Sequence, residues 1–244
     1  SILESGMYKD GILLTEFQKS ASFSATEYDR HLYINIQIIS TNHLIMKLII
    51  QMKKMFLNYH EKKQSVVLVV GHLGNWEWFC NAYRLIIPND VILVYRPLSS
   101  KYFDDLMYKI RSRFGVKVIA MNELLRTVIK SSSEKNNLAI GLAADQSPPP
   151  ESAYWTTFLN QETAVFNGPE KIARKFNTPV IYMHSKKIAR NKYILDAKLI
   201  CENPNEMPDG EITKQHVKFL EENIIEQPHI WLWSHRRWKH KKPN

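Results

Sequence analysis

The sequence predicts a single α/β domain, spanning residues 1–244, with a mainly parallel central sheet and helices on both faces. The first observation is a set of four short apolar runs, each long enough for a strand buried on both faces, at 66–70, 91–95, 116–120 and 138–143. The second is that stretches of helical periodicity alternate with these runs, which is typical of a parallel sheet. The third is the length of 244 residues without an internal repeat or linker, which fits one large domain.

Helices are predicted before and between these strands. Apolar residues at 44, 45, 48, 49, 52, 55, 56 and 59 follow one helical face, so 43–59 is expected to pack on the core. The next helical pattern covers 102–110, starts near two serines at 99 and 100, and stops at Gly115. Asn122 is expected to cap a helix over 123–130.

The stretch 145–161 differs in composition from the rest of the chain. It contains three consecutive prolines at 148–150, followed by aromatic residues at 154, 155 and 158, and is interpreted as a stiff loop. Such a loop could cover an acyl chain, or it could be an ordinary surface connection. Beyond it we expect a helix over 168–176 with proline in its tolerated first turn, strands over 179–184 and 193–201, and a helix over 211–227.

Composition restricts the partners that the chain can have. The net charge of +9 favours an anionic partner, which could be nucleic acid, an acidic protein or an anionic lipid. Cys80 and Cys201 lie far apart and have no partners at metal-ligand spacing, so we interpret them as buried thiols and expect no metal. The motifs of serine hydrolases, zinc proteases, P-loops and dinucleotide sites are missing from the sequence, and we expect no cofactor.

A glycine-flanked histidine follows the first apolar run, in the segment 71–77 with the sequence GHLGNWE. On a continuous helix, residues five apart diverge, so His72 and Glu77 could meet only if His72 lies in a turn and Glu77 in the first turn of the next helix. Gly74 makes such a turn sterically easy, and Asn75 is a plausible N-cap. An imidazole held by a carboxylate is a ready general base, although a purely structural histidine is the alternative.

Two further polar residues follow predicted strands. Arg96 comes directly after the run 91–95, and Asp145 comes just after 138–143. Ligands of parallel α/β sheets bind beyond the carboxyl ends of the strands, so we expect His72, Arg96 and Asp145 on one rim.

The C-terminal segment 230–242 combines three tryptophans with seven basic or histidine side chains. This composition suits the headgroup region of a membrane surface, and it could also stack on bases and neutralise phosphates. The alternative is a C-terminal strand whose tryptophans belong to the core.

Four ordered motifs together resemble the lipid A late acyltransferases of the lauroyl and myristoyl type, within the wider lysophospholipid acyltransferase group. They are 71–77 (GHLGNWE), 94–97 (VYRP), 144–146 (ADQ) and 231–239 (WLWSHRRWK). The resemblance implies a glycerol-3-phosphate acyltransferase-like fold. It also implies transfer of a fatty acyl chain from acyl carrier protein to a hydroxyl of a membrane-bound lipid A precursor, at the cytoplasmic face of a bacterial inner membrane. Members usually begin with a membrane anchor helix, which would lie upstream of Ser1.

The resemblance also suggests a role for each site residue. His72 would deprotonate the acceptor hydroxyl while Glu77 holds its other ring nitrogen, and the hydroxyl would attack the thioester without a covalent enzyme intermediate. Backbone amides at Gly74 and Asn75 would face the oxyanion, and Arg96 would bind a phosphate or sugar oxygen of the acceptor. Three further residues complete the expected substrate site: Asp145, which binds the acceptor or holds Arg96; Gln146; and Arg236, which binds an anion or is only solvated.

Two other readings stay open from the sequence. One is an acyltransferase that uses a lysophospholipid or an amino-acid-containing lipid as its acceptor. The other is a basic module that binds membranes or nucleic acid, in which His72 and Glu77 are structural; nucleic acid is not the expected partner.

Overall fold

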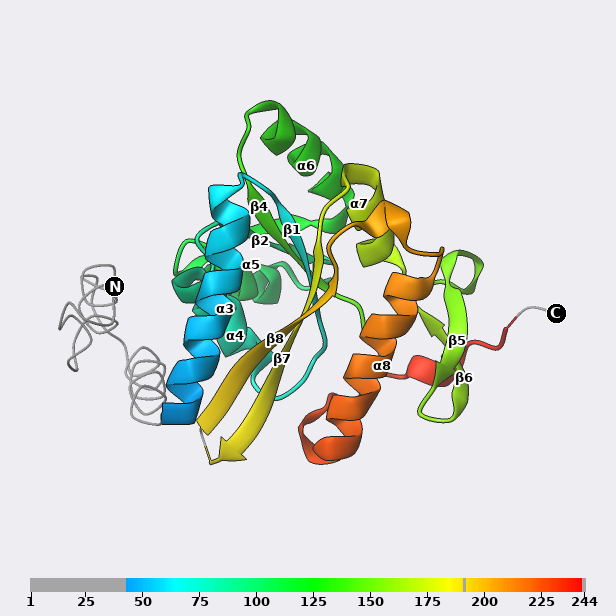
Figure 1. Cartoon of the computed structure of the whole chain (residues 1–244). Helices are drawn as coiled ribbons and strands as arrows, with labels where there is room; N and C mark the ends of the chain where they lie inside the picture. The colour runs from blue at the N-terminus through cyan, green and yellow to red at the C-terminus, as the bar shows by residue number, and fades with distance from the viewer. Residues whose placement is uncertain (1–42, 191, 243–244) are drawn as a thin grey trace.

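A six-stranded sheet with the strand order β3-β2-β4-β1-β7-β8 forms the centre of the computed structural model, which describes residues 43–190 and 192–242 (Figure 1). Every neighbouring pair is parallel except β7–β8, which confirms the predicted mainly parallel α/β fold. The strands are β1 (Val66–Val70), β2 (Asp90–Tyr95), β3 (Lys117–Ala120), β4 (Leu138–Ala143), β7 (Val180–Ala189) and β8 (Lys192–Cys201). Central strands β1 and β4 are continuous apolar runs because both of their faces are covered.

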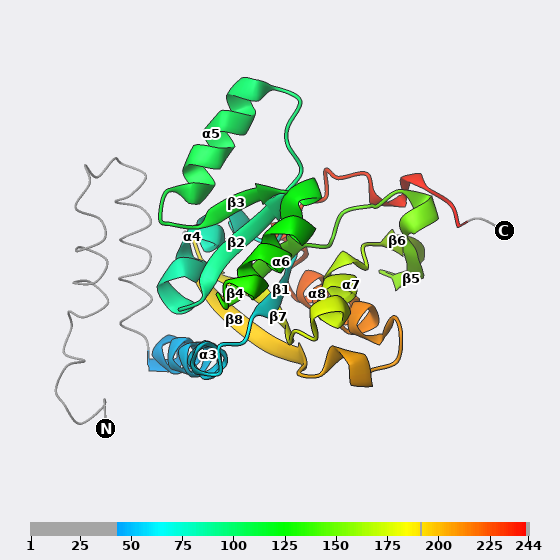
Figure 2. The ribbon, with the colours of Figure 1, turned by 90° about the horizontal axis from the view of Figure 1, so that it is seen from above.

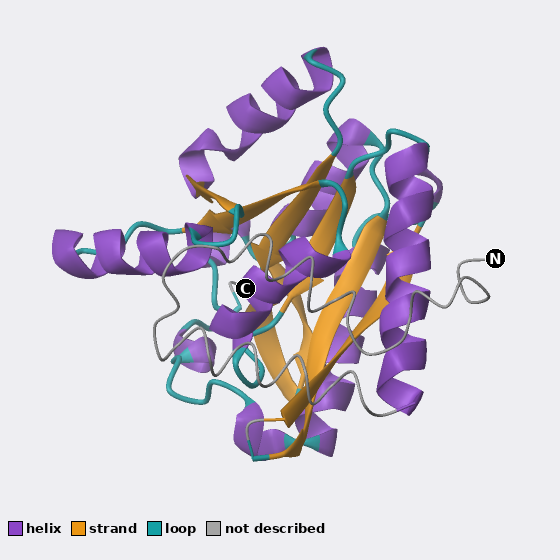
Figure 3. Ribbon diagram, turned by 90° about the vertical axis from the view of Figure 1, so that its left-hand side faces the viewer, coloured by secondary structure: helices purple, strands orange, loops and turns teal. Residues whose placement is uncertain are grey.

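Helices cover both faces of this sheet, as Figures 2 and 3 show. Buried side chains of α6, α7 and α8 pack on one face, and those of α3 and α4 pack on the other. The helices are α3 (His43–Glu61), α4 (Trp76–Ile86), α5 (Lys101–Ser112), α6 (Leu124–Ser133), α7 (Gly168–Phe176) and α8 (Glu211–Glu226). No helix within the described residues has the length and apolar composition of a membrane span.

The apolar stripe of α3 is confirmed where its side chains are described. Met52, Phe56 and Tyr59 are at most 3% exposed. The side chains of 43–51, and any segment upstream of Ser1, lie outside the described residues. Asn122 does not cap α6, because 121–123 form a short 3₁₀ turn and Glu123 occupies the N-cap position without a side-chain hydrogen bond.

The prediction of a loop over 145–161 is wrong in its second half. β5 (Tyr154–Phe158) and β6 (Gln161–Val165) form an antiparallel hairpin outside the main sheet. Its two-residue turn, Leu159-Asn160, has φ values of 49° and 60°, the left-handed geometry that matches the twist of a hairpin. The sequence signal was weak because this turn contains no glycine and the preceding prolines indicate a loop.

Candidate active site

The parallel register of β1 and β4 brings His72 and Asp145 together. Val70 aligns with Ala143 at the ends of the two strands, so the side chains two residues further on meet at the same edge. His72 Nδ1 lies 2.5 Å from Asp145 Oδ1, and the backbone N–H of His72 donates to Asp145 Oδ2 at 2.9 Å. The Asp145 side chain is fully buried, whereas 18% of the His72 side chain is exposed. The imidazole therefore has one anchored nitrogen and one side open to the surface.

The predicted hydrogen bond between His72 and Glu77 is not present. Glu77 instead accepts two hydrogen bonds from Arg111, from Nη2 at 2.6 Å and from Nε at 2.8 Å. Helix α4 begins at Trp76, so its first turn directs Glu77 towards α5, which carries Arg111. Trp76 links the two pairs, because its Nε1 donates to Glu77 at 3.2 Å and its ring lies edge-on to the His72 ring at 5.3 Å.

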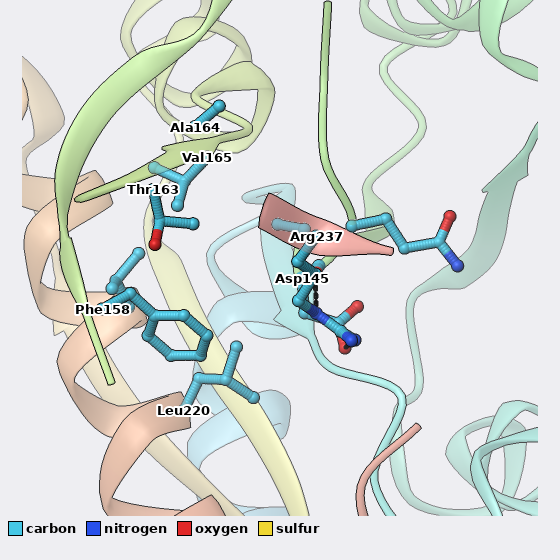
Figure 4. A pocket seen from close by; sticks show the side chains of 10 residues that line it. Asp145, Phe158, Thr163, Ala164, Val165, Leu220 and Arg237 are labelled. Atoms are coloured by element: carbon cyan, nitrogen blue, oxygen red, sulfur yellow. Dashed lines mark hydrogen bonds and ion pairs between the residues drawn. The ribbon is translucent and has the colours of Figure 1, made fainter. Parts of the chain in front are cut away.

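The buried Asp145 carboxylate has further donors from the C-terminal segment (Figure 4). Trp231 Nε1 donates to Oδ2 at 3.0 Å, and Arg237 Nη2 donates to the same oxygen at 3.1 Å. The Arg237 guanidinium also lies 3.6 Å over the Trp231 ring. Burial alone would raise the pKa of Asp145, but the hydrogen bonds and charge of His72, with Arg237, lower it to about 2. The carboxylate is therefore ionised throughout the physiological pH range.

Backbone hydrogen bonds fasten the C-terminal segment to the histidine loop. The N–H of Gly74 donates to Ile230 O at 2.8 Å, and the N–H of Leu232 donates to His72 O at 3.1 Å. Trp231 is only 4% exposed and belongs to the core, as the alternative prediction for this segment had it, whereas Trp233 is 52% exposed. The expected strand is not formed in 230–242, all of which the structure describes, because Trp231 makes only an isolated bridge to Leu73. A membrane or nucleic-acid role for this tryptophan is thereby excluded by its burial.

Gly74 and Asn75 shape the loop in different ways. Gly74 has φ +59°, and a Cβ there would lie 3.0 Å from Tyr193 Cε1, so only glycine fits without strain. Because its amide already binds Ile230 O, Gly74 is not a free oxyanion donor, contrary to expectation. Asn75 is the N-cap of α4, as predicted, and its Oδ1 accepts from Trp78 N at 3.4 Å.

The two arginines expected to contact anions are both at the surface. Arg96 lies exposed after β2, and no hydrogen bond or ion pair joins it to another residue of the described chain. Asp145 does not hold Arg96, because both of its oxygens are occupied by His72, Trp231 and Arg237. Arg236 is exposed as well, and its neighbour Arg237 is the arginine that turns inward.

A small pocket of about 280 Å³, including space open to solvent, adjoins the buried carboxylate (Figure 4). Gln146, predicted to bind substrate, is one of its lining residues. The hairpin supplies Phe158 and Thr163, and α8 supplies Leu220. Most of that volume is open to solvent, and the enclosed space that a water-sized molecule can occupy is only about 10 Å³, far below the roughly 300–1,000 Å³ of ordinary ligand sites.

No group of three His, Cys, Asp or Glu side chains that could hold a metal ion occurs in the described part of the chain. Both cysteines are free thiols. Burial raises the pKa of the Cys80 thiol to about 12, so it is a poor nucleophile at neutral pH.

Three residues of the site were not predicted from the sequence. Arg111 sits in an amphipathic helix without a motif, and only the orientation of α5 shows that it reaches Glu77. Trp231 and Arg237 lie in the motif 231–239, where burial decides which of several similar side chains faces the carboxylate.

Comparison with known families gives one match. The family model described as bacterial lipid A biosynthesis acyltransferase matches residues 20–240. No curated protein matches the chain at a significant level. Since the family match covers far more than half of its 244 residues, the chain belongs to the bacterial lipid A biosynthesis acyltransferase family.

Proposed function

We propose that the protein transfers a fatty acyl chain from acyl carrier protein to a hydroxyl of a lipid A precursor, with His72 as the general base. The observation that carries this proposal is the pairing of His72 Nδ1 with the buried, ionised Asp145. That pairing fixes the tautomer in which Nε2 has a free lone pair. None of the described residues forms a hydrogen bond with His72 Nε2, so this nitrogen is available to an acceptor hydroxyl.

The reaction is a direct displacement. His72 Nε2 takes the proton of the acceptor hydroxyl while its oxygen forms a bond with the thioester carbonyl carbon. The C–S bond then breaks, and the imidazolium returns the proton to the departing thiolate. Asp145 stabilises the imidazolium, in the role that the sequence interpretation gave to Glu77. No serine or cysteine occurs in 71–77 to hold the acyl group, and the raised pKa of Cys80 argues against its use.

The developing oxyanion would be stabilised at the start of α4. The first backbone amides of a helix have no partner within it, and the positive end of the helix dipole adds to their effect. Trp76 and Glu77 occupy the first two positions of α4, beside the histidine loop. These two amides would take the oxyanion-binding role expected of the Gly74 amide, which already donates a hydrogen bond to Ile230 O.

An anionic acceptor would fit two arginines that are at least partly exposed. The Arg111 side chain is 22% exposed beside Glu77, and Arg96 lies exposed at the end of β2. One guanidinium group can donate two parallel hydrogen bonds to phosphate oxygens, so we assign Arg111 and Arg96 to the acceptor headgroup. The net charge of +9 would also attract acyl carrier protein, an acidic donor, and the anionic cytoplasmic face of the inner membrane.

The test is an acyl-transfer assay with His72→Gln and, as a matched control, His184→Gln, which replaces a histidine in β7 that also pairs with an aspartate. His72→Gln should lose at least a hundredfold in kcat/KM with folding intact, because a general base contributes about 10²–10⁴-fold. The control should keep its activity. If His72→Gln stays active, the proposed mechanism is wrong.

The same assay separates the acceptors. Acyl carrier protein loaded with chains of several lengths is offered with a lipid A precursor, a lysophospholipid or an amino-acid-containing lipid. Transfer to a lysophospholipid alone would keep the mechanism and change the substrate. Binding to lipid without any transfer would favour a basic binding module.

A further inference from the structure

Helix α5 presents an unusual outer face. None of its twelve residues is buried, although five of the first eight are large apolar or aromatic side chains. Tyr102 is 75% exposed, Phe103 57% and Leu106 39%. Figure 2 shows α5 at the margin of the molecule, beyond β3 and β2. An exposed cluster of this kind on an ordered helix indicates an interaction surface.

The inner face of the same helix is firmly attached. Arg111 binds Glu77 in the active site. Asp104, about two turns before Arg111 on the same helix, accepts from the backbone N–H of Leu98 at 2.8 Å and from the Tyr95 hydroxyl at 3.3 Å. The orientation of α5 is therefore fixed from within, and the exposure of its outer side chains follows from that orientation.

The outer face changes character along its length. Residues at spacings of three and four share a helical face, so Tyr102, Leu106, Lys109 and Arg113 form one stripe. Its first half is apolar, and its second half is basic. Leu98, which precedes the helix, is 47% exposed as well, and its backbone N–H is bonded to Asp104.

We propose that this outer face of α5 docks onto the surface of an anionic lipid bilayer. Aromatic rings and leucine suit the headgroup and upper acyl region, while the adjoining lysine and arginine suit anionic headgroups. Lys101 adds a third positive charge, and Asp105 is the exposed acid among them. Because Arg111 on the inner face belongs to the active site, docking would bring that site to the bilayer, where a lipid acceptor resides.

Membrane docking serves the proposed function, on which this inference rests, but it is measured without catalysis. The variant Tyr102→Ser/Phe103→Ser/Leu106→Ser is sedimented with vesicles of phosphatidylglycerol and phosphatidylethanolamine, and the full chain is used throughout. The bound fraction at fixed lipid should correspond to a partition coefficient at least tenfold below that of the parent protein. The binding of the parent should weaken in high salt and on vesicles without phosphatidylglycerol.

A matched control replaces three equally exposed apolar residues elsewhere, as Ile188→Ser/Leu199→Ser/Ile225→Ser. Its partition coefficient should stay within twofold of the parent. Equal losses in both triple variants, or no loss in the α5 variant, would overturn the proposal. A parent dimer that becomes monomeric in the α5 variant, with vesicle binding unchanged, would assign the face to a second copy of the chain instead.

Activity then separates this inference from the proposed function. With a detergent-dispersed acceptor, the α5 variant should keep its rate within about twofold, whereas with a vesicle-embedded acceptor its rate should fall in step with vesicle binding. If the α5 variant loses vesicle binding while the parent binds vesicles but transfers no acyl chain, the docking face stands and the proposed function is wrong.

Discussion

Replacing Asp145 by asparagine tests the centre of the site, because it removes the charge while keeping the shape. Oδ2 receives three donors, from the His72 backbone, Trp231 and Arg237, so the new amide nitrogen cannot sit there without facing all of them. The amide must therefore place its nitrogen towards His72 Nδ1. That nitrogen donates, which forces the ring proton onto Nε2 and removes the base.

The expected loss in kcat/KM is about 10³–10⁴-fold, the size seen when the carboxylate behind a catalytic histidine is replaced by an amide. The folded state should also lose about 3–5 kcal/mol, because Arg237 keeps a buried charge without its partner. Activity is therefore measured per folded molecule, with the folded fraction taken from circular dichroism and urea unfolding.

A matched control is Glu170→Gln. Glu170 is another carboxylate, 3% exposed, that pairs with an arginine, but it joins α7 to α8 away from the histidine. It should lose stability similarly and keep the rate of its folded molecules. Two results would refute the reasoning: Asp145→Asn within tenfold of the parent, or Glu77→Gln losing as much rate as Asp145→Asn, which would return the role of histidine partner to Glu77.

Three further outcomes are expected. Gly74→Ala should lower the melting temperature by about 2–8 °C, because position 74 has a φ of +59° that strains alanine. Gly168→Ala should leave the melting temperature unchanged, because a Cβ there meets nothing within 4 Å, and equal shifts in the two variants would contradict the prediction. Trp231→Phe should cost about 1.5–3 kcal/mol in urea unfolding, since one donor to the charged Asp145 is lost; an unchanged midpoint would show that the hydrogen bond contributes nothing. Burial lowers the pKa of His216 to about 4 in the folded state. As the pH falls below 6.5, this histidine is therefore protonated in the unfolded chain before it is protonated in the folded one, which destabilises the fold. The parent should then lose about 2–3 kcal/mol between pH 6.5 and 4.5 that His216→Phe does not lose, and parallel pH curves would disprove this.

The strand and helix pattern was readable from the sequence because burial on both faces leaves a strong local signal. Runs such as 66–70 are apolar throughout, and the helices between them keep a 3.6-residue period. The hairpin at 154–165 was missed because it packs outside the sheet and its turn uses no glycine. Phe158 and Val165 of the hairpin share one buried cluster with the side chains of α8, a contact between segments far apart in the chain.

Sequence alone was enough to place His72 at the end of a buried strand, in a turn shaped by Gly74 and before a helix capped by Asn75, because strand ends and helix caps depend on neighbouring residues. Which carboxylate holds the imidazole depends on how the elements pack. The β1–β4 register selects Asp145, and the direction of α4 sends Glu77 to Arg111. Such partners lie far apart in the chain, and their meeting depends on the packing of whole elements, which local sequence does not encode.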